Sequence, residues 1–219
     1  EQLKKFAHVQ VLFNHRFESL VQNQDDISVT VKTLEGLHTW RASWLVGADG
    51  GRSQVRKSAG IEFAGYTWPE RYSVISTDFD FGRLDYTENA YISDPDQWVA
   101  IFKMPDLGPP GIWRMTLPVN NEVTDEVALA GPYAQNAIRR LTQESPQNDY
   151  AIVHQSIYNV HQRVAVHLRK HRILLVGDAA HVNNPLGGFG LNSGIHDAMN
   201  LGSKLTLVIQ KDAGEELLD

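Results

Sequence analysis

The chain has 219 residues, of which 42% are hydrophobic, with a formal net charge of −6 and no cysteine. A chain of this length and composition can bury a core and form one or two globular domains. The negative charge argues against nucleic-acid or anionic-membrane binding, and the lack of cysteine excludes disulfides, cysteine–zinc sites and thiol catalysis. No apolar run approaches membrane-span length, so no membrane span is expected, and the absence of cysteine is consistent with the cytoplasmic location that we expect.

Residues 1–63 are predicted to form mainly short strands. We expect the end of a helix first and then a strand over Val9–Phe13. Alternating apolar and polar residues over Phe17–Gln22 and Ile27–Leu34 favour an antiparallel pair. The turn-forming residues Asn23–Asp26 would join the two strands. Another apolar run, and so another strand, begins at Trp44.

Residues 64–159 change in character, because aromatic-rich alternating segments typical of an antiparallel sheet follow one another. Within Ile112–Val119 the alternation places the apolar side chains on one face and Arg114 with Thr116 on the other. The elements expected here are strands at Tyr72–Thr77, Trp98–Met104 and Ile112–Val119, a turn at Pro105–Gly111, a helix at Tyr133–Leu141 and a strand near Ala151–Tyr158.

The most informative segment runs from Arg172 to Asn192. Ile173–Val176 is a short apolar run, as expected of a strand buried on both faces of a parallel sheet. Asp178 follows at the carboxyl end of this strand, where open α/β sheets bind ligands and where a carboxylate can accept hydrogen bonds from sugar or polyol hydroxyls. The glycines of Gly187–Gly190 let the backbone approach a flat ligand closely.

A helix is expected from Ser193 onward, and its amino end would direct free N–H groups at that ligand. The 3.6-residue period predicts one apolar face for this helix. The side chains assigned to that face are Ile195, Ala198, Met199, Gly202, Leu205 and Ile209.

A second apolar run, Trp44–Gly47, ends in Asp49 and Gly50 and is followed by Ser53, Val55 and Arg56. Asp49 is predicted to cap the next helix by accepting backbone N–H groups. Arg56 is either a cation near a bound phosphate or a structural ion-pair partner, and the structural role is favoured because interior ion pairs often hold such turns.

Both segments resemble motifs of the FAD-dependent aromatic-ring monooxygenases, the class A flavoprotein hydroxylases of the p-hydroxybenzoate hydroxylase type. Their Ala-Asp-Gly-x-x-Ser-x-Val-Arg pattern appears at Ala48–Arg56. Their Gly-Asp-Ala-Ala-His, Pro-x-x-Gly-x-Gly-x-Asn, Asp-Ala and Asn-Leu patterns appear, in this order, at Gly177–His181, Pro185–Asn192, Asp197–Ala198 and Asn200–Leu201. The alternative for the longer match is a buried strand, a glycine loop and a core helix without a ligand.

The resemblance implies an α/β fold (α+β overall). A partial Rossmann-like FAD/NAD(P)-binding domain would be interrupted by an antiparallel β-sheet substrate domain. The implied layout is a first part of the FAD-binding domain over residues 1–63, the substrate domain over 64–159 and a second part of the FAD-binding domain over 160–219.

The resemblance also implies FAD as cofactor and NADPH or NADH as reductant. O₂ would add to the reduced flavin to give a flavin hydroperoxide that hydroxylates a small aromatic, phenolic substrate. Asp178 would hold the ribityl chain, and Pro185 with the Gly188–Asn192 segment would line the isoalloxazine ring, with N–H groups near its pyrimidine edge. The implied cofactor-binding residues are Gly177, Asp178, Pro185, Gly188, Gly190, Leu191, Asn192, Asp49, Gly50 and Arg56.

Other polar residues carry weaker signals. We expect a structural hydrogen-bonding role for His181, and no residue can be named as the base that activates a substrate hydroxyl. The nine histidines lack a metal-ligand spacing, so no metal site is predicted.

The family's Gly-x-Gly-x-x-Gly motif, which holds the FAD pyrophosphate, occurs nowhere in these residues. We therefore expect an internal fragment that is inactive alone. Two alternatives stay open, namely another flavoenzyme of the same scaffold (a halogenase or a prenyl-lipid reductase) or a non-catalytic truncated chain. The halogenase signature Trp-x-Trp-x-Ile-Pro is absent from the middle region.

Overall fold

The computed structural model describes residues 2–105, 111–143 and 149–219. The chain divides into two compact units: unit 1 comprises Glu1–Tyr66 and His161–Asp219, and unit 2 comprises Thr67–Val160. The sequence-based boundaries lie after residues 63 and 159. Most of the expected turn between residues 105 and 111 lies outside the described residues.

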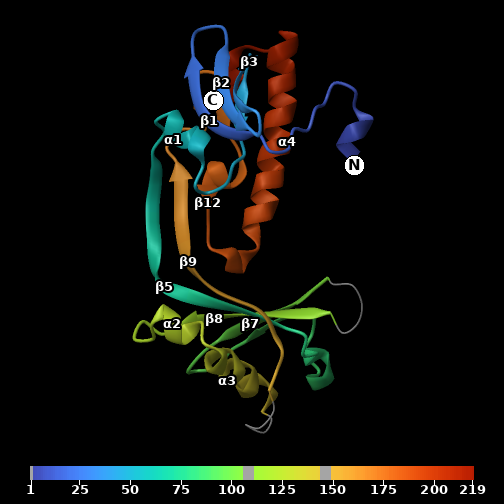
Figure 1. Ribbon diagram of the computed structural model, residues 1–219, viewed down its shortest axis with the longest axis vertical. Helices are drawn as coiled ribbons and strands as arrows, with labels where there is room; N and C mark the ends of the chain where they lie inside the picture. The colour runs from blue at the N-terminus through green and yellow to red at the C-terminus, as the bar shows by residue number, and fades with distance from the viewer. Residues whose placement is uncertain (1, 106–110, 144–148) are drawn as a thin grey trace. The chain divides into compact units, whose positions relative to one another are not determined.

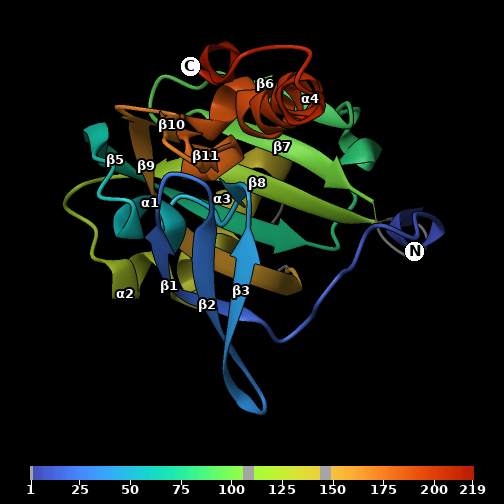
Figure 2. The ribbon, with the colours of Figure 1, turned by 90° about the horizontal axis from the view of Figure 1, so that it is seen from above.

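A three-stranded antiparallel meander opens unit 1 (Figure 2). Its strands are β1 (Arg16–Gln22), β2 (Ile27–Thr33) and β3 (Gly36–Ala42). Asn23 builds the turn between β1 and β2, because its side-chain oxygen accepts the N–H groups of Asp25 and Asp26, each at 2.9 Å. The sequence predicts no strand at β3, since all its side chains are exposed and hydrophobic periodicity is weak in such a strand.

The prediction of a strand over Val9–Phe13 is wrong. These residues follow a short 3₁₀ helix, η1 (Gln2–Lys5), and have no strand conformation. Phe13 is 82% exposed. A strand needs a neighbour that accepts and donates its backbone hydrogen bonds, and no strand in the described part of the chain pairs with this run.

The second sheet of unit 1 has the order β10–β11–β4, formed by β10 (Arg169–Lys170), β11 (Ile173–Leu175) and β4 (Leu45–Gly47). Strand β11 is buried throughout and runs parallel to β4, which confirms the expected buried parallel strand. Helix α1 (Gln54–Ser58) follows β4. Its Val55 joins a buried cluster with Ile27 of β2 and Ile173 of β11, so the two sheets of unit 1 share one core.

Helix α4 (Phe189–Gln210) is the longest helix of unit 1 (Figure 1). It begins at Phe189 rather than at Ser193, so Gly190, Leu191 and Asn192 lie in its first turn. The predicted apolar face is largely wrong, since Ile195, Met199 and Ile209 are more than half exposed. The helix is apolar on more than one side, and only its packing decides which side is covered. The packed side carries Leu201, Leu205 and Val208.

Unit 2 is built on an antiparallel sheet whose strands include β6 (Asn89–Ile92), β7 (Val99–Met104) and β8 (Ile112–Val119). The long strands β5 (Phe63–Thr77) and β9 (Ile152–Ala165) contribute residues to both units, and the complete sheet has the order β12–β9–β5–β8–β7–β6.

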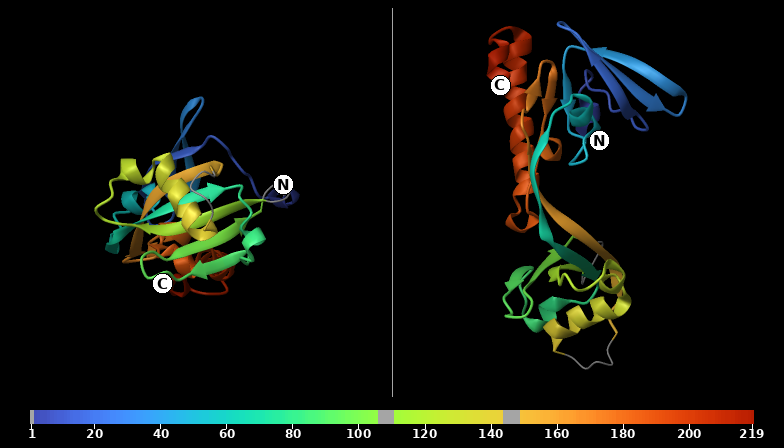
Figure 3. Two further views of the ribbon diagram at one scale, coloured as in Figure 1. Left: turned by 90° about the horizontal axis from the view of Figure 1, so that it is seen from below. Right: turned by 90° about the vertical axis from the view of Figure 1, so that its left-hand side faces the viewer.

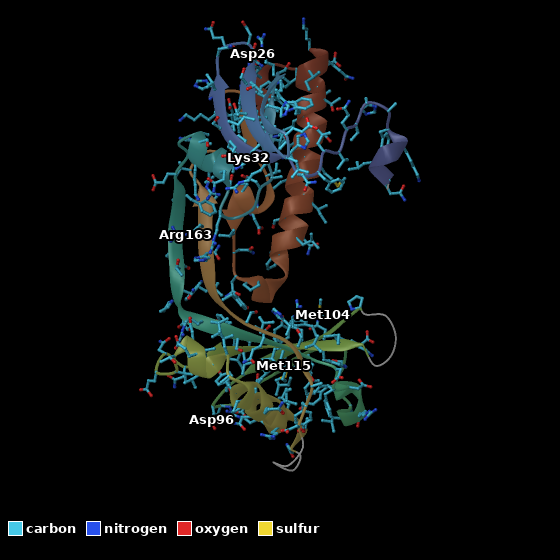
Figure 4. All side chains as sticks on the ribbon, in the orientation of Figure 1. Asp26, Lys32, Asp96, Met104, Met115 and Arg163 are labelled. Atoms are coloured by element: carbon cyan, nitrogen blue, oxygen red, sulfur yellow. The ribbon has the colours of Figure 1, made fainter. Side chains whose placement is uncertain are left out.

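Helices α2 (Asp125–Ala128) and α3 (Gly131–Thr142) follow β8, and α3 covers one face of the unit 2 sheet (Figure 3). Met115 of β8 lies in the layer between sheet and helix and is fully buried with Ile138 of α3 (Figure 4). The predicted inner face of β8 is confirmed, because its alternate apolar residues Trp113, Met115, Leu117 and Val119 are all buried.

The remaining elements are short: η2 (Phe81–Leu84), η3 (Gly177–Ala179), β12 (His181–Val182), η4 (Pro185–Gly187) and η5 (Glu215–Leu218). None of the helices in the described part of the chain has the length and apolar character that a membrane span requires.

Candidate functional site

The two motif segments meet because their strands are neighbours. Leu175, near the end of β11, pairs with Gly47 at the end of β4. The Val176 N–H continues this ladder and donates to the Gly47 carbonyl at 3.1 Å. Parallel strands end at the same edge of a sheet, so the turns carrying Asp49 and Asp178 leave the sheet on the same side.

Arg56 joins these two turns. Its Nη1 donates to the Ala179 carbonyl at 2.7 Å and its Nη2 donates to the Gly51 carbonyl at 2.9 Å. The guanidinium also lies 3.7 Å from the centre of the Phe63 ring. Arg56 is 4% exposed, and burial lowers its pKa while the charge of Asp49 opposes that change. This geometry is that of a structural residue, which is the role favoured for Arg56 from the sequence. Its partners are backbone carbonyls, whereas an ion-pair partner was expected.

Asp49 accepts backbone N–H groups at the start of helix α1, as predicted, while Ser53 is the N-cap residue and accepts the Arg56 N–H. The Asp49 Oδ2 accepts the Gln54 N–H at 2.7 Å and the Val55 N–H at 3.1 Å. Burial alone would raise the pKa of this carboxyl group, but hydrogen bonds from Ser53, Val55 and Gln54 outweigh it and hold the pKa below its ordinary value. Gly50 follows with a φ of +82°, which takes the chain into the loop before α1.

Asp178 lies in the one-turn helix η3 directly after β11 and is exposed. Its carboxylate has no hydrogen-bond partner among the residues that the structure describes. Gly177 precedes it with a φ of +59°, a left-handed conformation that favours glycine. The carboxylate at the strand end is therefore available to a ligand with hydroxyl groups.

The segment from Pro185 to Asn192 forms a turn and the start of α4. Gly188 is the N-cap of α4, with a φ of +67° and open space where a Cβ would lie. The Asn192 side-chain amide donates to the Gly188 carbonyl at 2.9 Å, so Asn192 braces the turn. Leu191 is 77% exposed. The first N–H groups of a helix have no partner within it, so this end of α4 can bind an acceptor-rich ligand.

A groove of about 440 Å³ adjoins these turns, bounded by the unit 1 ends of β5 and β9, by β12 and by Ser193 of α4. Among its lining residues are Gly65, Arg163 and His181. Within residues 2–105, 111–143 and 149–219, no group of three or more His, Cys, Asp or Glu side chains is arranged to hold a metal ion, and this includes the surroundings of His181.

Comparison with known families decides the classification. The FAD binding domain family matches residues 1–219, the whole of the sequence. The chain belongs to this family of FAD binding domains. Membership confirms the sequence-based assignment to the flavoprotein hydroxylase fold, with its mixed α/β architecture.

Named relatives of this FAD binding domain are aromatic hydroxylases. The chain is 36% identical to para-nitrophenol 4-monooxygenase of Pseudomonas sp. (strain WBC-3), over 100% of this chain and 53% of that protein. It is 34% identical to the 3-(3-hydroxy-phenyl)propionate/3-hydroxycinnamic acid hydroxylase of Mycolicibacterium smegmatis, over 99% of this chain and 37% of that protein.

Solved structures give the same relationship. The crystal structure of p-nitrophenol 4-monooxygenase PnpA from Pseudomonas putida DLL-E4 superposes with a TM-score of 0.87 at 32% identity, covering 99% of this chain and 54% of that one. A ternary complex of aklavinone-11 hydroxylase with FAD and aklavinone has a TM-score of 0.80 at 26% identity. The FAD binding domain described here therefore spans about half the length, or less, of the relatives it matches.

The tertiary structure also adds residues to which the sequence assigned no role. Asp197 of α4 accepts hydrogen bonds from Gly177 and His181, and Gly194 lies against Gly177. Asp197 belongs to the Asp-Ala part of the motif, so its position was visible in the sequence. Its partners were not, because they depend on how α4 packs against η3.

Proposed function

We propose that the protein is an FAD-dependent monooxygenase that hydroxylates a small aromatic, phenolic substrate, with NADH or NADPH as reductant and O₂ as the oxygen source. The observation that carries this proposal is the exposed Asp178 carboxylate at the carboxyl end of the parallel strand β11, which has no hydrogen-bond partner within the described residues. It is close in sequence to a glycine turn and to the amino end of α4. The family membership and the named aromatic hydroxylase relatives support it.

The residues present fit a flavin. Asp178 would accept hydrogen bonds from ribityl hydroxyls, and Gly177 keeps the backbone before it free of a Cβ. Pro185, Gly188, Gly190, Leu191 and Asn192 would lie along the isoalloxazine, since Gly188 has open space where a side chain would lie and the first turn of α4 directs N–H groups outward. Asp49, Gly50 and Arg56 would act mainly by shaping the neighbouring turn.

Bound FAD would supply the redox chemistry, taking a hydride from NAD(P)H and passing one oxygen atom of O₂ to the ring of the substrate. The chain's own residues would bind and orient the flavin. N–H groups at the amino end of α4 would stabilise negative charge on the reduced ring.

We assign flavin binding to unit 1 and binding of the aromatic substrate to unit 2. Unit 2 supplies a sheet with Tyr72, Trp98 and Tyr158 in contact, the ring centres being 5.7 Å apart in each of the two pairs formed by Tyr72. We also propose a cytoplasmic location, on the composition of the sequence.

Two observations indicate that these 219 residues form part of the flavin site. No Gly-x-Gly-x-x-Gly motif occurs among them. They match 53% and 54% of the length of two para-nitrophenol 4-monooxygenases. We propose that the FAD pyrophosphate is bound by the part of the family architecture that these residues do not cover.

The proposal is tested with absorbance spectroscopy and an oxygen electrode on the purified protein extended to the full length of its relatives. We expect the absorbance spectrum of a bound flavin, and the flavin released from the protein should be FAD. NAD(P)H oxidation should become faster when phenols are added. A flavin spectrum without any phenol-stimulated turnover contradicts the hydroxylase proposal and leaves another flavoenzyme. A protein that binds no flavin contradicts the proposal altogether.

A further inference from the structure

Asp197 connects helix α4 to the turn that follows β11. Its Oδ2 accepts the Gly177 N–H at 2.9 Å and lies 2.8 Å from Nε2 of His181. Both side chains are largely buried, with 25% exposed for Asp197 and 27% for His181. One carboxylate oxygen therefore holds both ends of the Gly177–His181 segment, and Asp178 lies within that segment.

The short Asp197 side chain reaches Gly177 because α4 and η3 approach closely at a pair of glycines. A Cβ added at Gly194 would lie 3.4 Å from the Gly177 Cα, at the short limit of ordinary van der Waals contact, so the two backbones lie close together here. Gly194 and Asp197 are three positions apart and share one face of α4. The glycine contact and the carboxylate contact therefore form one docking point between helix and turn.

The rest of the turn is also held by hydrogen bonds. The Ala180 N–H donates to the Gly177 carbonyl at 2.8 Å, and the Ala165 N–H donates to the Ala180 carbonyl at 2.7 Å. Arg56 holds the Ala179 carbonyl. The Asp178 carboxylate is thus exposed to a ligand, while hydrogen bonds from several neighbouring segments hold the backbone of its turn.

We propose that Asp197 is a positioning residue for flavin binding. It holds the Gly177–His181 turn in the conformation that presents Asp178 to the ribityl hydroxyls. This inference rests on the proposed function, because it assumes that Asp178 contacts FAD. Hydrogen bonds to an ionised carboxylate are stronger than neutral ones, and a turn that is already ordered loses less conformational entropy when the ligand binds.

A double-mutant cycle separates positioning from a role in stability alone. FAD dissociation constants are measured by flavin fluorescence for the native protein, Asp178→Ala, Asp197→Ala and the double variant. We expect Asp197→Ala to weaken FAD binding roughly tenfold or more, the effect of losing a charge-assisted hydrogen bond. In the Asp178→Ala background the same change should have little further effect, because the residue it positions is already missing.

Two conservative variants, both expected to fold, separate the effect of the acceptor's position from the effect of its charge. Asp197→Asn keeps an oxygen acceptor in place and loses only the charge, so FAD affinity should fall less than in Asp197→Ala. Asp197→Glu keeps the charge but moves the acceptor by one carbon, so FAD affinity should fall. His196→Ala is the matched control, since His196 is exposed, precedes Asp197 on α4 and has no hydrogen-bond partner in the described ranges.

The outcomes are distinguishable. If Asp178→Ala binds FAD normally, the proposed function of this turn fails. If Asp178→Ala binds weakly but Asp197→Ala and Asp197→Glu bind like the native protein, the positioning role is overturned while the flavin site stands. Equal losses for Asp197→Ala in both backgrounds also overturn it, because they show an effect that does not pass through Asp178. If Asp197→Ala does not fold, weaker FAD binding by Asp197→Glu than by Asp197→Asn supports positioning, and the reverse order overturns it.

Discussion

Arg56 and Ala179 are 123 positions apart in the sequence and are joined by a 2.7 Å hydrogen bond from the Arg56 Nη1 to the Ala179 carbonyl. The same guanidinium holds the Gly51 carbonyl, so one buried cation fixes the turn after β4 against the turn after β11. This relationship gives Arg56 a structural role at the candidate flavin site, and a substitution of Arg56 tests that role.

Replacing Arg56 with methionine should lower stability. Methionine fills much of the same volume but leaves the buried Ala179 carbonyl and the partly buried Gly51 carbonyl without their donor, which costs about 2–4 kcal/mol in the free energy of unfolding. Urea denaturation followed by circular dichroism measures the change. Arg52→Met is the control, since Arg52 is exposed in the same loop. If both variants unfold at the same urea concentration as the native protein, the two hydrogen bonds of the Arg56 guanidinium contribute nothing to stability.

Asp178→Ala should weaken FAD binding by roughly ten- to a hundredfold, because a charged hydrogen-bond partner contributes about 1.5–3 kcal/mol. Stability should change little, since Asp178 is exposed. Fluorescence titration of the apoprotein with FAD gives the dissociation constant. Asp212→Ala, which removes another exposed carboxylate, serves as the control. An unchanged dissociation constant for Asp178→Ala would refute the assignment of this site.

The two glycines at the start of α4 should respond differently to alanine. Gly188 has a φ of +67°, so Gly188→Ala should cost about 1–2 kcal/mol of stability through backbone strain. Gly190 lies inside the helix, and a Cβ there would make an ordinary contact of 3.6 Å with the Asn183 side chain. Gly190→Ala should therefore keep or raise the melting temperature, because alanine is the better helix former.

The same Gly190→Ala variant tests close approach of the backbone to the flavin. If the ring lies against this turn, the added methyl group should weaken FAD binding or slow flavin reduction without any loss of fold. Melting curves and flavin titrations are recorded side by side. Normal flavin behaviour in Gly190→Ala would mean that this glycine is not needed for ligand contact.

Asp49 should make the stability of unit 1 depend on pH. Its pKa is held below the ordinary value of 3.8 in the folded state, so its contribution is present above that value and is lost as pH falls through the lower, folded-state pKa. Asp49→Asn should reduce the free energy of unfolding near neutral pH, and the difference from the native protein should shrink in acid. Asp25→Asn, at an exposed turn position, is the control. A difference that grows on acidification contradicts this linkage.

The 219 residues by themselves should not catalyse hydroxylation. They lack the glycine-rich motif for the pyrophosphate and match about half of two para-nitrophenol 4-monooxygenases. We expect no phenol-stimulated NAD(P)H oxidation or oxygen uptake when FAD is added to this chain alone. The positive control is a chain extended to the full length of its relatives. Substrate-dependent turnover by the 219 residues would show that they contain a complete site.

The sequence alone determined the class of the fold and the position of the candidate site along the chain. A buried parallel strand at Ile173, the acid after it and the helix cap at Asp49 follow from local patterns, because short apolar runs, glycines and capping side chains act within a few residues. The aromatic strands of residues 64–159 were also visible, since alternation in β8 records which side faces a core.

Only the tertiary structure decided which distant groups meet. It leaves Val9–Phe13 without a strand partner, covers the Leu201 side of α4 instead of the Met199 side, directs the Arg56 donors to backbone carbonyls and brings Asp197 to Gly177. None of these follows from local propensity. The hydrogen-bond partners of a buried cation or carboxylate are set by which backbones pack together, and a helix that is apolar on two sides is oriented by the glycine contact and the core it covers.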